Sequence, residues 1–279
     1  MSIQYVIENF FVCPICGCSM YVTDDCKSAK CKGNECGKKQ HSFDFSADGY
    51  LSFGQTGGDS KEAVRARRLF LRKDYYLPAA YEVCSAVKKY IPSCNLLIDA
   101  GCGEGYYTSM LSDVSDIAIG FDLSKFACGA GAKQAKNDRK NNLFFATSSV
   151  FSLPLSNECA DAVTNIFAPC AEDEYSRILK DGGCLFVVGA GKEHLMGLKQ
   201  AIYDNVYENG ERADLPVKMK HIDRIITSHT ICVEGESDIG ALFSMTPYYW
   251  RTKENDREKL KGLDRLTTEI SFEINIYKK

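Results

Sequence analysis

The glycine-rich stretch that follows a short apolar run constrains the fold of this chain more than any other feature. Residues 95–108 read NLLIDAGCGEGYYT, in which an apolar run leads into an acid and three alternating glycines. This pattern predicts a buried parallel strand that turns tightly into a helix. Glycine has no Cβ, so the backbone of such a turn can pass close to a ligand. The sequence therefore predicts a ligand-binding turn at this position.

The spacing of the glycines excludes two phosphate-binding motifs. A dinucleotide-binding turn would need its third glycine where Tyr106 stands, and a P-loop would need Lys and Ser or Thr directly after Gly105. The observed order, from Asp99 to Gly105, resembles motif I of the class I S-adenosylmethionine (SAM)-dependent methyltransferases. SAM carries a sulfonium and an ammonium group but no phosphate, so a carboxylate at the strand end suits it.

A second acid supports a SAM site. Residues 116–122 read DIAIGFD, and Asp122 follows the first motif by about 20 residues, where a carboxylate binds ribose hydroxyls in related folds. The alternative is that Asp122 caps the helix expected to begin near Ser124. Many SAM enzymes carry an acid near the adenine at the position where this chain has serines. The expected cofactor-binding residues are Asp99, Gly101, Gly103, Gly105, Tyr106, Asp122, Ser148 and Ser149.

The remaining chain alternates between strand and helix patterns, which indicates an α/β fold. We expect a Rossmann-like class I methyltransferase with a mostly parallel seven-stranded sheet and helices on both faces. Its carboxyl strand ends would carry the ligands. The expected strands are 96–98, 116–122, 143–146, 160–166, 184–188, 224–233 and 269–277. The expected helices are 61–72, 172–179 and 194–207, with 239–266 mostly helical and 181–183 stopping the second helix.

Composition describes an ordinary globular protein. Hydrophobic residues make up 45% and charged residues 25%, and the net charge is -3. No apolar run approaches the roughly 18 residues that span a membrane. The first residues lack the basic start and long apolar core of a signal peptide, so we expect a cytoplasmic protein. Any nucleic-acid surface must be a local basic patch, since the net charge is slightly negative.

Fourteen cysteines are unevenly distributed, and six lie before residue 40. Disulfide frameworks are rare in the cytosol, so the later cysteines are expected to act as small core hydrophobes. These eight are Cys84, Cys94, Cys102, Cys128, Cys159, Cys170, Cys184 and Cys232. The early cluster needs a separate explanation.

Cys13 and Cys16 form a Cys-x2-Cys knuckle in the stretch CPICG. A structural zinc ion takes four nitrogen or sulfur ligands, and the second pair would come from Cys31, Cys36 and His41. Spacing does not distinguish Cys31/Cys36, Cys36/His41 and Cys31/His41. A redox dithiol is the alternative, but such motifs lie in a βαβ context that this segment lacks. The sequence therefore predicts a small β-rich zinc module, which would stabilise a segment with few apolar side chains.

A glycine-rich stretch, residues 54–60, marks a boundary between this module and the rest. The helix expected at 61–72 places Arg65, Arg68 and Arg72 on one face. This face is either a solvated side of an amphipathic helix or a phosphate-contacting surface near the active site. The predicted organisation is a zinc-binding RNA-recognition module at 1–53, a linker and basic helical segment at 54–94, and a SAM-dependent methyltransferase domain at 95–279.

Seven segments in order closely resemble the 23S rRNA (guanine-N1)-methyltransferases, and the resemblance covers almost the whole chain. They are CPIC, HSFDFSADGY, DSKEAVRARRLFL, DAGCGEGYYT, FAPC, HLMGLKQAIYDNVYE and MTPYYW. The resemblance implies methyl transfer from SAM to N1 of a guanine in a 23S rRNA hairpin, a zinc module that helps to hold the RNA, and a homodimer. In some Gram-positive members the modification contributes to macrolide-type antibiotic resistance. The family usually has Cys-x3-His as its second ligand pair, whereas this chain has CKGNECGKKQH.

Methylation at guanine N1 requires loss of the N1 proton and a linear arrangement of N1, the methyl carbon and sulfur. The base must also be unpaired or flipped. The candidate catalytic residues are Asn165 at the guanine edge, His194 as a base, and Phe167 and Trp250 as stacking partners. The aromatic segment around Trp250 either forms a lid or packs on the core. The competing functions are a SAM-dependent methyltransferase for a small molecule or another RNA, and a non-catalytic RNA-binding scaffold.

Overall fold

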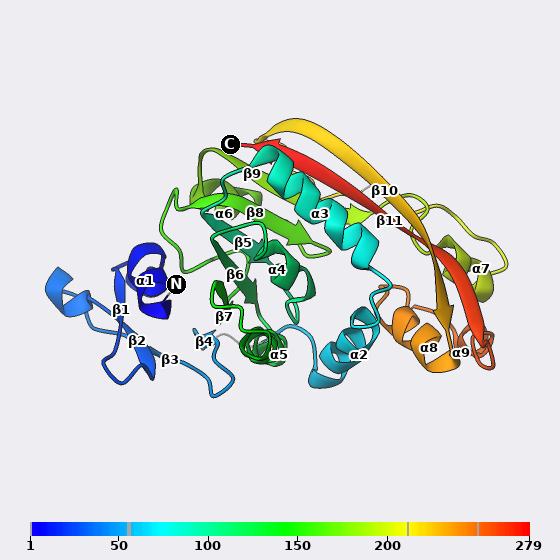
Figure 1. Ribbon diagram of the computed structural model, residues 1–279, viewed down its shortest axis with the longest axis horizontal. Coiled ribbons are helices and arrows are strands. Elements are labelled where there is room, and N and C mark those ends of the chain that lie inside the picture. Colours follow the sequence, from blue (N-terminus) through cyan, green and yellow to red (C-terminus); the bar gives the residue numbers. More distant parts are fainter. Residues whose placement is uncertain (1, 55–56, 211, 250) are drawn as a thin grey trace.

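The protein folds around one large twisted sheet (Figure 1), as seen in a computed structural model. The structure describes residues 2–54, 57–210, 212–249 and 251–279, with only the backbone of Cys36. The strands of the large sheet are β4 (Leu51–Ser52), β5 (Leu96–Ala100), β6 (Ile117–Asp122), β7 (Leu143–Thr147), β8 (Ala160–Ile166), β9 (Leu179–Ala190), β10 (Lys220–Glu234) and β11 (Arg265–Lys278). Their spatial order is β10-β11-β9-β8-β5-β6-β7-β4.

Six neighbouring strands, from β4 to β9, run parallel, and the C-terminal hairpin of β10 and β11 is antiparallel. The predicted α/β class with a mostly parallel sheet is confirmed. The described sheet has eight strands, however, not the seven expected. The additional strand is β4, which pairs with Ala146 and Thr147 at one edge. Two residues are too short for a periodic signal, so this pairing was invisible in the sequence.

Helices cover both faces of the sheet. The helices are α1 (Ile3–Phe10), α2 (Lys61–Leu71), α3 (Leu77–Tyr90), α4 (Tyr106–Leu111), α5 (Lys125–Asn137), α6 (Glu172–Ile178), α7 (Met196–Ile202), α8 (Glu236–Ser244) and α9 (Glu254–Glu258). Successive residues of a strand point to opposite faces. Leu96 and Ile98 accordingly pack in the cluster that contains α1 and α6, whereas Leu97 packs in the cluster that contains α3 and α8.

The N-terminal module is a three-stranded antiparallel sheet of β1 (Met20–Val22), β2 (Ser28–Cys31) and β3 (Ser42–Asp44), with a 3-10 turn, η1 (Gly33–Cys36). The predicted β-rich start of the chain is therefore confirmed. This module shares a hydrophobic cluster with the large sheet, and the rings of Phe11 and Phe121 lie 5.9 Å apart. Figure 1 shows the blue module at the β4 end of the sheet.

Some boundaries differ from those predicted. The helix expected at 172–179 ends at Ile178, because Leu179 takes an extended backbone and pairs with Ala160. Residues 181–183 consequently lie within β9 and stop no helix. The helix expected at 194–207 is the shorter α7. Within the described ranges, no helix combines the length and apolar character needed to cross a membrane.

Candidate functional site

The glycine turn connects β5 to α4 as predicted, but a side chain would meet different surroundings at each of its three glycines. All three have positive φ, at 84°, 53° and 81° for Gly101, Gly103 and Gly105. A Cβ on Gly101 would lie 2.4 Å from the Cβ of Ala168, and one on Gly105 would lie 2.6 Å from the Phe145 ring. A Cβ on Gly103 would meet only Arg67 at 3.5 Å. Gly103 is thus the glycine of the turn at which a Cβ would meet no atom closer than ordinary van der Waals contact.

Asp99 lies beneath this turn and is 1% exposed. One carboxylate oxygen accepts a hydrogen bond from Thr108 at 2.6 Å, and the other accepts one from Thr164 at 2.8 Å. Burial raises the pKa of Asp99 to about 6, although both threonines oppose the shift. In this structure Asp99 braces the strand end from within, and its predicted contact with SAM stays a prediction.

Asp122 connects the end of β6 to the glycine turn. Its Oδ2 accepts a hydrogen bond from the backbone N–H of Gly103 at 3.0 Å, and its Oδ1 accepts one from that of Ser124 at 2.7 Å. Ser124, not Asp122, is the N-cap of α5, since its hydroxyl accepts a hydrogen bond from Ala127. Burial raises the pKa of Asp122. The acid therefore lies beside the glycine turn, and its predicted contact with a ribose stays a prediction.

Glu104, inside the glycine turn, is a candidate site residue that no pattern in the sequence indicated. Its side chain is 4% exposed, and neither carboxylate oxygen has a hydrogen-bond partner in the described part of the chain. Burial raises the pKa of Glu104, and the charge of Arg67 opposes that shift. The Arg67 guanidinium is 3.6 Å away. A buried carboxylate without a hydrogen-bond donor is costly, so Glu104 fits a cationic ligand group such as the SAM ammonium.

The basic helix α2 packs over this turn and against α5. Arg67 pairs with Asp59 as well as Glu104. Arg68 donates a hydrogen bond to Gln134 of α5 at 3.1 Å, and Arg72 contacts the same amide. Most of these arginines therefore hold α2 in place. On the predicted basic face, Arg65 and Arg72 are exposed and Arg68 is half-buried, and a phosphate-contacting role of that face stays a prediction.

The two serines after β7 mainly bond to their own loop. Ser148 is buried, and its hydroxyl donates to the carbonyl of Ser152 at 2.9 Å. Ser149 accepts a hydrogen bond from the backbone N–H of Phe151 at 3.3 Å. The Tyr106 hydroxyl is buried without a hydrogen-bond partner among the described residues. A role for these three residues in SAM binding stays a prediction.

An open cavity of about 560 Å³ lies at the carboxyl ends of β8 and β9. Several of the residues that line it are small, and Phe167, which also lines it, is 46% exposed. Its lining residues are Phe167, Ala168, Pro169, Gly189, Ala190, Asn209, Gly210, Arg212 and Asp214. Ala168 is also the residue that a Cβ on Gly101 would meet. The cavity and the glycine turn therefore share a wall.

Asn165 is not among the residues that line this cavity, and its predicted role at the guanine edge stays a prediction. It is fully buried. Its amide donates to Pro169 and Tyr175, each at 3.0 Å, and its oxygen accepts from Arg212 at 2.8 Å. With both ends of the amide engaged, Asn165 shapes the loop after β8.

His194 is poorly suited to its predicted role as a base. It packs against Phe167, with ring centroids 5.8 Å apart, and burial lowers its pKa to about 4. Its Nδ1 already accepts a hydrogen bond from the backbone N–H of Ser271 at 3.2 Å. Phe167 does line the cavity, and its predicted role as a stacking partner stays a prediction. Trp250 lies outside the described residues.

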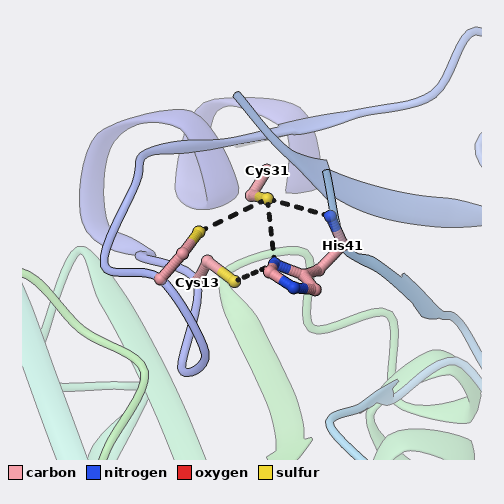
Figure 2. Close-up of side chains that lie close together, drawn as sticks. Cys13, Cys31 and His41 are labelled. Carbon is pink, nitrogen blue, oxygen red and sulfur yellow. Dashed lines mark hydrogen bonds between the residues drawn. The ribbon is translucent and has the colours of Figure 1, made fainter. Parts of the chain in front are cut away.

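Four of the five predicted metal ligands converge in the N-terminal module. Figure 2 shows Cys13, Cys31 and His41 pointing toward one another. With Cys16, their ligand atoms all lie within 4.8 Å of one another. The Sγ atoms of Cys16 and Cys31 are 3.7 Å apart, and the Nδ1 of His41 is 3.5 Å from the Sγ of Cys13.

These separations match a tetrahedral zinc site. Zn–S bonds of about 2.3 Å and Zn–N bonds of about 2.0 Å give tetrahedron edges of roughly 3.5–3.8 Å. The knuckle is closed by hydrogen bonds between Cys13 N and Cys18 O and between Gly17 N and Cys13 O, each 2.8 Å long. The set Cys13, Cys16, Cys31 and His41 is therefore compatible with zinc, whereas the side chain of Cys36 lies outside the description.

Comparison with known proteins agrees with this arrangement. Residues 98–187 match a family model described as a methyltransferase domain. The chain carries a SAM-dependent methyltransferase domain. The matched residues run from β5 through the glycine turn into β9 and so contain both the turn and the loop beside the cavity. SAM as the cofactor of this methyltransferase is therefore confirmed, and the Glu104 carboxylate and the open side of Gly103 fit it.

The methyltransferase is similar over nearly its whole length to curated proteins. It is 26% identical over 284 residues to YxjB of Bacillus subtilis, provisionally named a 23S rRNA (guanine-N1)-methyltransferase, with 96% of each chain covered. It is 23% identical over 287 residues to the 23S rRNA (guanine(748)-N1)-methyltransferase of Streptomyces fradiae, with 96% of this chain and 97% of the relative covered. The predicted resemblance to this group is confirmed.

A solved structure shares the fold. A protein of Anaeromyxobacter dehalogenans, provisionally described as a type II methyltransferase, superposes with a TM-score of 0.50 at 13% identity. The superposition covers 70% of this chain and 94% of that protein. The likeness at this identity concerns the fold alone.

Proposed function

We propose that this methyltransferase transfers a methyl group from SAM to N1 of a guanine in a 23S rRNA hairpin. One observation carries the proposal: the glycine turn and the open cavity share a wall at Ala168. A donor bound at the turn and a base bound in the cavity would then lie side by side. The full-length similarity to proteins named for this activity supports the choice of rRNA as the acceptor.

The residues on each side of that wall have separate tasks. Bound SAM supplies an electrophilic methyl group on a sulfonium. Glu104 pairs with the ammonium of the methionine part, and Asp122 accepts hydrogen bonds from the ribose. Phe167 stacks on the flipped guanine, whose Watson–Crick edge then faces the methyl group. Most of the rate comes from this alignment.

The zinc module of residues 1–53 holds the RNA beside the cavity, and residues 54–94 connect it to the domain of residues 95–279. The module contacts the loop after β7, since Val12 donates a hydrogen bond to the carbonyl of Pro154 at 3.0 Å. That loop lies at the carboxyl ends of the parallel strands, as the glycine turn does. Exposed lysines suited to RNA phosphates stand at positions Lys27, Lys32, Lys38 and Lys39. A homodimer in the cytoplasm is part of this proposal, and light scattering of the purified protein tests the dimer.

The function is tested with purified protein, tritiated SAM and unmodified 23S rRNA. We expect label in the RNA and a block to reverse transcription at one guanine, because an N1-methyl group prevents Watson–Crick pairing. Metabolite extracts serve as the competing acceptor. Label in small molecules alone would replace the rRNA proposal by a small-molecule methyltransferase. Label in neither, with SAM still bound, would favour a non-catalytic scaffold.

A further inference from the structure

The segment between α7 and β10 folds back over the ends of β8 and β9 and is anchored there. Arg212 donates hydrogen bonds to the Asn165 side chain at 2.8 Å and to the carbonyl of Val188 at 3.2 Å. Further along, the Glu172 carboxylate accepts hydrogen bonds from the backbone of Val217 at 3.0 Å and of Met219 at 2.9 Å. The residues between these anchors are therefore held in a defined position beside the cavity.

Asp214 lies between the two anchors and lines the cavity. Its Oδ2 accepts hydrogen bonds from the backbone N–H of Cys170 at 2.8 Å and from Arg212 Nη2 at 3.0 Å. Among the described residues, its Oδ1 accepts one hydrogen bond, from Arg212 Nε. A carboxylate oxygen accepts two hydrogen bonds, so Oδ1 retains one acceptor position. The side chain is 46% exposed.

The other polar side chains that line the cavity, those of Asn209 and Arg212, already form hydrogen bonds within the protein. The Asn209 amide donates to the carbonyls of Gly191 at 3.0 Å and His194 at 2.9 Å, and its oxygen accepts from Lys199 at 2.7 Å. Arg212 is occupied by its anchoring contacts. Among the described residues of the cavity wall, Asp214 is the carboxylate available to a ligand.

We propose that Asp214 accepts the hydrogen bond of the guanine N1–H and takes that proton during methyl transfer. This inference rests on the proposed function. In the step, the N1–C bond forms while the C–S bond breaks, and the C–S electron pair stays on sulfur as a neutral thioether. The N1–H bond breaks, and the proton moves to Oδ1 of Asp214. Half-exposure of the carboxyl then lets the proton pass to water.

The surroundings of Asp214 suit this task. The Arg212 hydrogen bonds hold the pKa of Asp214 below its ordinary value, so the group is ionised before the reaction. Such a weak base takes the proton as N1 becomes cationic on methylation. Adenine and cytosine have a lone pair where guanine has N1–H, so the carboxylate also disfavours those bases.

Ionisable groups from the segment of Asp214, from α6 and from the loop before α6 lie close to this carboxyl. Besides Arg212 on its own segment, they are Glu172 at the start of α6 and the Cys170 thiol. The pKa of Glu172 is lowered by backbone hydrogen bonds that outweigh its burial, and burial raises the pKa of Cys170 to about 11. A pH profile of the reaction therefore reports on the proton acceptor.

The test compares D214N and D214A with wild type and with a matched control, D173N. Asp173 also tethers this segment, through Lys218 at 2.6 Å, but it does not line the cavity. Single-turnover methylation of a 23S rRNA hairpin is measured with saturating SAM from about pH 6 to about pH 9. D173N should match wild type. D214N should be roughly 10²- to 10⁴-fold slower at pH 7, with unchanged SAM affinity.

The pH dependence separates a chemical role from a structural one. Without Asp214, N1 must lose its proton to solution, so the D214N rate should rise about tenfold per pH unit while the wild-type rate stays nearly level. Formate should restore part of the D214A rate. A level D214N profile at the wild-type rate, or a slow D214A without formate rescue, overturns the inference alone. A wild-type protein that binds SAM but leaves guanine N1 unmethylated overturns the proposed function as well.

Discussion

Replacing Glu104 with Gln should weaken SAM binding and, at the same time, stabilise the protein without SAM. The carboxylate is 4% exposed and has no hydrogen-bond donor among the described residues, so its charge is poorly compensated without a bound cation. A hydrogen bond to a charged group contributes about 1.5–3 kcal/mol. Loss of that contact corresponds to a rise in the Kd for SAM of roughly 10- to 150-fold.

The effect of E104Q on stability has the opposite sign. An unpartnered buried polar group costs about 1–3 kcal/mol, and Arg67 at 3.6 Å offsets part of it, so we expect a gain of about 1 kcal/mol. This corresponds to a rise in Tm of about 2 °C. Burial raises the pKa of Glu104 above its ordinary 4.5, so its stabilising contribution exists at low pH and is lost as pH rises through the folded-state pKa. The advantage of E104Q should therefore grow with pH and vanish below about pH 4.5.

Calorimetric titration with SAM and thermal unfolding without it measure the two effects on the same samples. E82Q, on the exposed side of α3, is the control and should change neither quantity. An E104Q protein that binds SAM within twofold of wild type would refute the assignment of Glu104 to the ammonium. A lower Tm without SAM would refute the argument that this charge is poorly compensated.

Three further outcomes follow from the structure. Removing zinc with a chelator, or the substitution H41A, should unfold residues 1–53 and abolish RNA binding while SAM binding survives. Metal analysis and circular dichroism measure this, and a folded metal-free module would contradict it. G101A should destabilise the protein by at least about 1 kcal/mol in urea, since its Cβ meets Ala168 at 2.4 Å at a φ of 84°, and an unchanged midpoint would contradict the clash. Asp99 has a pKa of about 6 against an ordinary 3.8, so the folded state should lose about 3 kcal/mol as pH rises from 4 to above 6. The variant D99N should lack that slope in urea titrations, and an equal slope in both proteins would rule the assignment out.

Local patterns in the sequence were sufficient for the class of fold and for SAM as the cofactor. The alternating glycines after an apolar run predicted the turn between β5 and α4, and the apolar run at 160–166 predicted β8 with the observed bounds. The Cys-x2-Cys knuckle predicted half of the metal cluster. These features depend on residues close together in the chain, where backbone sterics and ligand spacing operate directly.

Local patterns were misleading where a side chain's environment decides its role. Asn165 and His194 are polar residues that stand in the sequence close to residues that line the cavity. Packing nevertheless buries both side chains, and Asn165 Oδ1 and His194 Nδ1 accept hydrogen bonds within the protein. Glu104 looked like a spacer between glycines, and only its burial beside α2 marks it as a ligand-binding residue. No sequence motif marks Asp214. Its position depends on contacts with residues about 45 positions away along the chain, such as the hydrogen bond from the backbone of Cys170.

The sequence by itself determined that this chain folds as an α/β methyltransferase with a glycine turn after its first long strand and a group of possible metal ligands near its start. It did so because φ preferences, strand periodicity and ligand spacing are local properties. Only the tertiary structure decided which of the possible ligands meet, with Cys31 and His41 completing the cluster. Only it decided which acids face a ligand, since burial and hydrogen-bond partners come from segments far apart in the chain. Two threonines donate hydrogen bonds to Asp99, whereas the Glu104 carboxylate has no hydrogen-bond donor among the described residues.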